Sequence, residues 1–165
     1  MVKYWVCKRA PAFVYEAMEC LGGNGYVEEA TLARLYREAP VNAIWEGSGN
    51  VMCLDVLRAF RSDGEAARGV LNSLLRGTAD LPGAAETARA IEQVLAGPSA
   101  EADARGLVER LAVLAASDAL KTSAPQVAEI WARVMLSGAR GAMWGTAELD
   151  DRERFNLLDR ALPAA

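Results

Sequence analysis

The chain has 165 residues, 52% of them hydrophobic, which is enough for one ordinary core. No apolar run reaches the roughly 18 residues that a membrane span needs, and the first residues do not read as a secretion signal, so we expect a cytoplasmic protein. The net charge of -4 gives no global attraction to nucleic acid.

The residue types exclude several kinds of site. Histidine is absent, so no imidazole base, Ser-His relay or histidine metal ligand is available. The chain has three cysteines, an odd number, and they lack CxxC spacing: Cys7, Cys20 and Cys53. This pattern favours buried free thiols over disulfides or a metal site. We therefore expect no metal site, and any acid-base chemistry falls to carboxylates.

Apolar residues recur at three- and four-residue steps through the first part of the chain. This spacing predicts three helices, over residues 2–21, 28–39 and 51–60. Pro11 either kinks the first helix or lies in the first turn of a helix that begins at Arg9 or Ala10. Gly22 ends that helix, and Pro40 ends the next one.

After Ser62-Asp63-Gly64 the sequence becomes rich in alanine, with loops marked by Gly, Pro and Ser. The expected helices cover residues 65–76, 84–96, 100–119, 125–143 and 147–161. Strand-like alternation is nearly absent, so we predict an all-α helical bundle (1–62) followed by an additional helical domain (63–165). The expected second core consists of Leu71, Leu74, Leu75, Ile91, Val94, Leu95, Leu107, Leu111, Leu114, Val127, Ile130, Trp131 and Val134.

The stretch from Ile44 to Asn50 is the most informative for chemistry. Glu46 follows Ile44 and Trp45, and a carboxylate that such neighbours desolvate binds a proton more readily, which suits a general base. Gly47 and Gly49 let the backbone approach a ligand, while Ser48 or Asn50 can cap the next helix. The earlier cluster Gly22-Gly23-Asn24-Gly25 offers a second set of amides.

Two arginines, Arg34 and Arg37, share one face of the second helix. Either they form a solvated stripe, or they fix the turn bearing Glu46 by bonding to Glu38 or to backbone carbonyls.

Three features follow one another in the sequence: the glycine cluster, the Arg-x-x-Arg pair, and Ile44-Trp45-Glu46-Gly47-Ser48. In this order they resemble the flavin-containing acyl-CoA dehydrogenases over roughly residues 10 to 60. Two motifs are most similar to the AidB-like branch of this family, which are flavoproteins of the bacterial response to DNA alkylation. These motifs are Arg34-Leu35-Tyr36-Arg37-Glu38 and Ile44 to Ser48. The resemblance covers the carboxyl-terminal domain of that family.

The resemblance implies a role for each residue of this stretch. Glu46 would be the base that removes the α-proton of an acyl-CoA thioester while a hydride leaves for the flavin of FAD, and its amide would polarise the thioester carbonyl. Trp45 and Gly47 would lie beside the substrate. Glu19, Gly22 and Gly23 would contact the cofactor of a neighbouring subunit, and Ser48 and Asn50 the adenosine side of the subunit's own.

Four residues depart from the family pattern. Glu19 replaces Gln, Trp45 replaces Tyr, Ser48 replaces Thr and Asn50 replaces Gln. A carboxylate at position 19 would repel a pyrophosphate.

The second domain carries a weaker signal. By resemblance to the AidB-like branch it could contact double-stranded DNA through Arg58, Arg61, Arg68, Arg76, Arg133 and Arg140. The alternative is that these arginines are solvated or form ion pairs of little energetic weight. A separate hypothesis, opposed to the enzyme fragment, makes the helices an interaction module for oligomerisation or double-stranded DNA binding. Trp131 is expected in the core rather than in a ligand cage, and the acidic residues from Glu148 to Glu153 are expected to favour a helix start.

The family's amino-terminal and β-domains have no counterpart in these residues. We therefore expect that the isolated chain neither retains flavin nor turns over acyl-CoA. Exposed apolar surface around Trp5, Phe13 and Met18 would favour self-association into a homo-oligomer.

Overall fold

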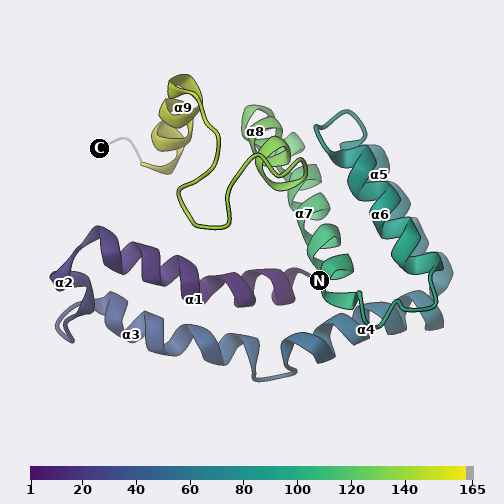
Figure 1. The fold of residues 1–165 in the computed structure, drawn as a ribbon, viewed down its shortest axis with the longest axis horizontal. Coiled ribbons are helices and arrows are strands. Elements are labelled where there is room, and N and C mark those ends of the chain that lie inside the picture. Colours follow the sequence, from purple (N-terminus) through teal and green to yellow (C-terminus); the bar gives the residue numbers. More distant parts are fainter. Residues whose placement is uncertain (163–165) are drawn as a thin grey trace. The chain divides into compact units, whose positions relative to one another are not determined.

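The computed structural model describes residues 1–162, which form α-helices joined by short turns (Figure 1). Over this range the β-type pairing is limited to one isolated bridge between Arg140 and Ala147, so the predicted all-α class is confirmed. No helix in the same range is both long and apolar enough to cross a bilayer. The helices are α1 (Val2–Cys20), α2 (Gly23–Tyr26), α3 (Thr31–Glu38), the 3-10 segment η1 (Ala39–Ala43), α4 (Gly49–Ser62), α5 (Gly64–Thr78), α6 (Ala84–Ala96), α7 (Ala104–Ser123), α8 (Pro125–Met135) and α9 (Asp151–Ala161).

The contacts divide the chain into two compact units. The first consists of residues 1–68 and 94–112, and the second of residues 69–93 and those from Val113 onward. Each unit is therefore built from stretches that are separate in the sequence.

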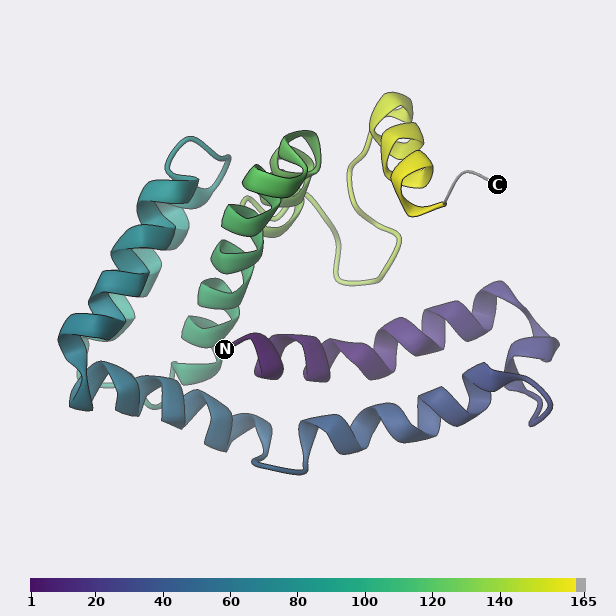
Figure 2. The ribbon, with the colours of Figure 1, turned by 180° about the vertical axis from the view of Figure 1, so that it is seen from behind.

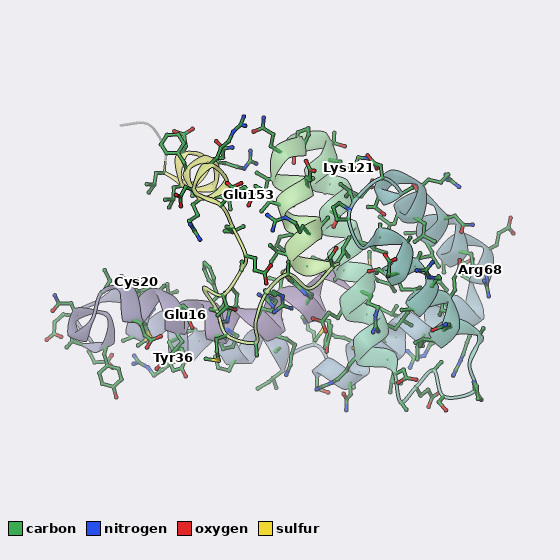
Figure 3. All side chains as sticks on the ribbon, turned by 45° about the horizontal axis from the view of Figure 1, so that its top comes forward. Glu16, Cys20, Tyr36, Arg68, Lys121 and Glu153 are labelled. Atoms are coloured by element: carbon green, nitrogen blue, oxygen red, sulfur yellow. The ribbon has the colours of Figure 1, made fainter. Side chains whose placement is uncertain are left out.

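In the first unit, α1 and α3 lie side by side, and the chain turns between them through α2 (Figures 1 and 2). α1 also packs against η1 and α4. The rings of Tyr15 on α1 and Tyr36 on α3 have centroids 6.1 Å apart, and Tyr36 is labelled in Figure 3. The buried apolar residues of this unit are Tyr4, Met18, Ala33, Ala39, Cys53, Leu57, Ala104, Leu107, Val108, Leu111 and Ala112.

Helix α1 is continuous from Val2 to Cys20 although it contains Pro11. A proline removes one backbone donor, and the rest of this long helix tolerates that loss. The alternative start at Arg9 or Ala10 is therefore wrong. The apolar surface expected around Trp5, Phe13 and Met18 is only partly present: Phe13 is exposed, Trp5 is half-buried, and Met18 is buried and belongs to the core.

The second unit has a core drawn from α5 to α8. Six of the predicted core residues are buried: Leu71, Ile91, Leu107, Leu111, Leu114 and Ile130. The other seven, Trp131 among them, are half-buried. Leu107 and Leu111 belong to the first unit, not to the second.

Helix α9 is held by a network of charged groups. Asp150 caps it, and Glu153 completes a capping box with the Asp150 backbone, so these two acidic residues favour the helix start as predicted. On α8, Arg133 Nη2 donates to both Glu153 carboxylate oxygens at 2.6 Å (Glu153 is labelled in Figure 3). These hydrogen bonds lower the pKa of Glu153 and raise the pKa of Arg133.

The three cysteines are free thiols in different settings. Cys53 is buried as predicted, and burial raises the pKa of its thiol. Cys7 is half-buried, while Cys20 is exposed at the carboxyl end of α1 (Figure 3). The prediction of burial is therefore wrong for Cys20, because α1 ends there with no element packed over it among the described residues.

Candidate functional site

A strained turn between η1 and α4 carries Glu46. Glu46 has a φ of 59°, and it is the one residue other than glycine with a positive φ among residues 1–162. Gly47 follows with a φ of 112°, and Ser48 occupies the N-cap position of α4 in an extended conformation. A left-handed conformation is unfavourable for a residue with a Cβ, so the fold holds Glu46 in this position against a local cost.

The Glu46 side chain points toward solvent and is anchored from α1. Lys3 Nζ donates to the Trp45 carbonyl oxygen at 2.9 Å and lies 3.5 Å from Glu46 Oε2. The same ammonium lies 5.3 Å from the centre of the Trp45 ring. Lys3 thus holds both the backbone and the carboxylate of the turn.

The expected apolar enclosure of Glu46 does not form within the described part of the chain. The Glu46 side chain is 64% exposed, and Ile44 and Trp45 are 65% and 55% exposed. The turn directs these side chains outward, so its own neighbours do not desolvate the carboxylate. The catalytic role of Glu46 remains a prediction.

Beside this turn the first unit has a pocket of about 330 Å³. It is lined by Cys7, Lys8, Pro11, Pro40, Ala43, Ile44, Ser48, Gly49, Asn50 and Arg105. The structure therefore brings Ser48 and Asn50 together in one cavity, at the amino end of α4. Ser48 makes no capping hydrogen bond with its side chain.

Arg105 reaches this pocket from the amino end of α7. Its Nε donates to Asn50 Oδ1 at 2.8 Å, across 55 residues of sequence. Lys8 comes from α1. The sequence analysis did not single out Lys8, Arg105 or Lys3, and no local pattern in the sequence connects them with the turn.

A buried pair lies beneath the pocket. A Cβ added to Gly49 would lie 3.4 Å from the Tyr4 ring, and the Tyr4 hydroxyl interacts with the Cys53 thiol. Burial is the main cause that raises the pKa of Tyr4 as well as that of Cys53. Both groups are therefore neutral at pH 7 and support the pocket as packing residues.

The first glycine cluster lies at the other end of α1. Gly22 has a φ of 56°, and no atom lies within 4 Å of a Cβ added to Gly22 or Gly23. Glu19 is exposed next to them. The part of α1 after Pro11 separates these three predicted cofactor residues from the pocket that contains Asn50. The two predicted sets therefore do not form one site among the described residues.

The arginine pair of α3 does not contact the Glu46 turn. Arg37 donates two hydrogen bonds to the Glu28 carboxylate, at 2.6 and 2.8 Å, and these raise the pKa of Arg37. Arg34 pairs with Glu38 at 3.2 Å on the same helix. The predicted bond from Arg34 to Glu38 is therefore present, and both arginine side chains are exposed, as in the solvated stripe. Among the described residues neither arginine is paired with the Glu46 turn, so a role in fixing that turn is not supported.

Three of the six arginines considered for DNA contact are already paired. Arg58 pairs with Asp55, Arg61 with Glu101, and Arg133 with Glu153. Arg58, Arg61 and Arg68 belong to the first unit, whereas Arg76, Arg133 and Arg140 belong to the second. The structure therefore does not gather the six on one surface of either unit.

Comparisons with known proteins give the family context of this site. Residues 1–60 match the family model described as acyl-CoA dehydrogenase, C-terminal domain. The chain is 42% identical to the putative acyl-CoA dehydrogenase AidB of Escherichia coli (strain K12), over 96% of this chain and 28% of AidB. It is 48% identical to acyl-CoA dehydrogenase family member 11 of Caenorhabditis elegans, over 36% of this chain and 10% of that protein. The mitochondrial short-chain specific acyl-CoA dehydrogenase of Bos taurus is 38% identical over 38% of this chain and 16% of its own length, so the chain spans under a third of each relative.

Proposed function

We propose that the chain acts as the carboxyl-terminal part of a flavin-dependent acyl-CoA dehydrogenase, because residues 1–60 match the acyl-CoA dehydrogenase C-terminal domain model. The similarity to AidB continues through the remaining helices, which favours an AidB-like architecture. The end of the family match at residue 60 agrees with the proposed boundary near residue 62, whereas the contacts include residues 63–68 and 94–112 in the first unit.

The conformation of Glu46 is the observation that carries the proposal. Glutamate is a poor choice for a left-handed position on stability grounds, since Gly or Asn would adopt it at lower cost. Unfavourable backbone positions of this kind cluster at functional sites. A carboxylate presented on such a turn serves as the base that accepts the α-proton of an acyl-CoA thioester.

The surrounding residues place Glu46 for this step. Lys3 fixes the turn through the Trp45 carbonyl and the Glu46 carboxylate. The exposed Trp45 offers a flat apolar surface to the substrate, and Gly47 keeps the backbone beside it free of side-chain bulk. The Glu46 amide then polarises the thioester carbonyl, which stabilises the negative charge that develops when the α-proton leaves.

The remaining predicted residues would hold FAD, which when bound accepts the hydride from the β-carbon. Ser48 and Asn50 fit the adenosine side, because they line a pocket that a Cβ at Gly49 would fill. Gly22 and Gly23 are open to another molecule, and Glu19 lies beside them. At 1.5 Å per residue, Gly22 lies roughly 16 Å along α1 from Pro11, which lines the pocket of Ser48 and Asn50. This separation agrees with contact to the cofactor of a neighbouring subunit.

A homo-oligomer follows from this arrangement. Val2, Val6 and Phe13 on α1 are 57%, 50% and 60% exposed, and such apolar side chains favour burial against a second copy.

The test is Glu46→Gln in the complete acyl-CoA dehydrogenase that this proposal implies. Glutamine keeps the shape of the side chain but cannot accept the proton, so we expect turnover and exchange of the substrate α-proton with deuterated water to fall by about 10²- to 10⁴-fold. Glu129→Gln on α8 is the matched control and should leave both rates unchanged. Normal turnover of the Glu46→Gln protein would discard the proposal.

Contact with double-stranded DNA is the alternative function for the helices after residue 62. The pairing of Arg58, Arg61 and Arg133 with carboxylates disfavours it, since neutralised arginines contribute little to phosphate binding. A salt titration of the chain with plain duplex DNA decides the question: absence of binding at low salt removes this function.

A further inference from the structure

The peptide group between Trp45 and Glu46 has different neighbours at its two ends. Lys3 Nζ donates to its carbonyl oxygen at 2.9 Å. Its N–H, which belongs to Glu46, donates to no acceptor among residues 1–162. A trans peptide directs its C=O and its N–H to opposite sides, and no peptide bond in this range is cis. The free N–H therefore lies on the side of the peptide group opposite to the ammonium.

The backbone of Trp45 is held from two directions. Its own N–H donates to the Val41 carbonyl oxygen at 3.0 Å, and its carbonyl oxygen accepts from Lys3. The Trp45 ring centre lies 5.3 Å from the same ammonium, a distance at which an aromatic ring attracts a cation. One lysine therefore holds both the main chain and the side chain of the residue before Glu46, and this limits rotation of the peptide plane that carries the free N–H.

The ammonium lies closer to the backbone than to the Glu46 carboxylate. Its distance to Glu46 Oε2 is 3.5 Å, beyond the usual hydrogen-bond range of about 2.7 to 3.2 Å. The Glu46 side chain is 64% exposed, so water screens this ion pair. A lysine that bound the carboxylate tightly would oppose the acceptance of a proton. The geometry therefore favours an effect of Lys3 on the peptide group, and it leaves the carboxylate available.

A cation at a peptide carbonyl strengthens the N–H of the same peptide group as a donor. Amide resonance couples the two ends, so a charge beside the oxygen draws electron density away from the nitrogen. Hydrogen bonds linked in this way strengthen one another by about 10–30% each. Such an N–H stabilises a developing oxyanion more than a neutral carbonyl, because the interaction grows with the charge on the acceptor. The gain therefore falls on the rate of reaction and not on substrate binding.

We propose that Lys3 is a positioning residue of the reaction, which acts through the Trp45–Glu46 peptide group. By binding the Trp45 carbonyl oxygen, it orients the Glu46 N–H toward the oxygen of the acyl thioester and strengthens that hydrogen bond. The α-proton goes to the Glu46 carboxylate, and the electron pair that it leaves is shared with the thioester oxygen. This inference rests on the proposed function, which assigns that oxygen to the Glu46 amide. It adds to the site a residue 43 positions before Glu46 in the sequence.

The first test is the steady-state kinetics of Lys3→Met in the complete acyl-CoA dehydrogenase. Methionine keeps much of the length of the side chain but removes the donor and the charge. We expect kcat to fall about tenfold, the effect of one charge-assisted hydrogen bond, while KM stays within about twofold. Lys3→Arg keeps a charged donor for the same carbonyl oxygen, so it should recover most of the lost kcat.

A spectroscopic measurement separates this role from a purely structural one. The ligand is an acyl-CoA with a ¹³C-labelled carbonyl and no hydrogen on the β-carbon, which binds but transfers no hydride. A strong N–H donor lowers the stretching frequency of the bound carbonyl, so Lys3→Met should raise that frequency relative to the parent enzyme. The same rise should appear when Lys3→Met is combined with Glu46→Gln, because glutamine keeps the peptide group and removes only the carboxylate.

Lys121→Met on α7 is the matched control. The Lys121 side chain is 33% exposed, against 37% for Lys3, and it also pairs with a carboxylate, that of Asp80. This variant should change neither kcat nor the carbonyl frequency, and circular dichroism melting verifies that each variant keeps its fold. The inference is overturned if Lys3→Met changes KM alone, if kcat falls while the carbonyl frequency stays the same, or if Lys3→Arg is no better than Lys3→Met.

The two proposals can fail separately. Loss of turnover in Glu46→Gln, together with normal kcat and an unchanged carbonyl frequency in Lys3→Met, would refute the role of Lys3 alone. Normal turnover of Glu46→Gln, together with a raised carbonyl frequency in Lys3→Met, would refute the assignment of the base alone. The carbonyl frequency provides this separation because it reports on the peptide N–H and does not require proton transfer.

Discussion

The two glycine-rich turns of the first unit are similar in sequence, but their glycines have different neighbours. In the first turn Gly25 is buried, and a Cβ there would lie 2.3 Å from the Met18 carbonyl oxygen. In the second turn a Cβ at Gly49 would meet the side chains of Lys8, Tyr4 and Arg105 at 3.3 to 3.6 Å. One glycine lets two backbones touch, and the other leaves space beside charged side chains.

This difference separates a glycine needed for packing from a glycine that opens a site. The backbone of α1 cannot move away from Gly25 without opening the turn, so that glycine is required by the fold. Around Gly49 the neighbours are side chains and not backbone: the exposed side chains of Lys8 and Arg105 and the buried ring of Tyr4. The second turn also holds Glu46 and Gly47 in positive-φ conformations.

The largest effect is expected for Gly25→Ala. The added methyl group would overlap the Met18 carbonyl, and we expect a loss of roughly 3 kcal/mol in the free energy of unfolding. Urea denaturation measures it. Gly23→Ala in the same short helix meets nothing within 4 Å and should stay within about 0.5 kcal/mol of the parent. Equal stabilities for the two variants would contradict the distinction between packing and open glycines.

A smaller loss is expected for Gly47→Ala in the second turn. Its φ of 112° lies outside the regions that alanine adopts, so we expect a loss of about 2 kcal/mol. Gly69→Ala inside α5 provides the contrast, because its φ is ordinary and its surroundings are open. That change should stabilise the chain by up to about 1 kcal/mol, through helix propensity. Thermal melting that ranks the two variants in the opposite order would show that the turn relaxes around position 47.

Helical periodicity predicted most elements of this fold because the buried faces repeat at the helical spacing. The helix expected over residues 84–96 forms as α6 (Ala84–Ala96), and the first helix is within one residue of its prediction. The predicted helix ends are wrong where a side-chain contact or a glycine outweighs the helix propensity of the sequence. The predicted helix over residues 125–143 ends at Met135, and Gly138, with a φ of 74°, follows that end.

The start of α3 shows a second cause of error. A helix was expected from Glu28 because acidic residues favour the first turn, but α3 begins at Thr31. The Glu28 carboxylate binds Arg37, and the backbone turns between Val27 and Ala30. This pairing depends on the position of Arg37 in the tertiary structure, and helix propensities take no account of tertiary contacts.

Only those residues of the candidate site that are adjacent in the sequence could be predicted. Glu46, Ser48 and Asn50 were identified because they are adjacent in the sequence and resemble a family motif. Arg105 is 55 residues from Asn50, and nothing in its own helix marks it as a member of the site. The sequence did not predict the exposure of Glu46, because Ile44 and Trp45, which were expected to enclose its carboxylate, are themselves 65% and 55% exposed.

The smallest stability effect is expected for Glu46→Asn, and its sign is informative. Asparagine tolerates the left-handed region better than glutamate, so we expect the free energy of unfolding to rise by about 0.5 kcal/mol, although the exposed ion pair with Lys3 is lost. Glu129→Asn, the same change on the exposed surface of α8, should lower stability by about 0.5 kcal/mol because asparagine is the poorer helix former. Urea denaturation of the two variants in parallel measures the difference.

A stabilising Glu46→Asn change would mean that the fold keeps glutamate at a cost. In the complete enzyme the same variant should lose turnover as Glu46→Gln does, because neither side chain accepts a proton. Stability and turnover would then move in opposite directions at one residue, as expected where a catalytic group is held in strain. If Glu46→Asn instead destabilised the chain by more than Glu129→Asn does, Glu46 would contribute to the fold, and its conformation would no longer support a catalytic role.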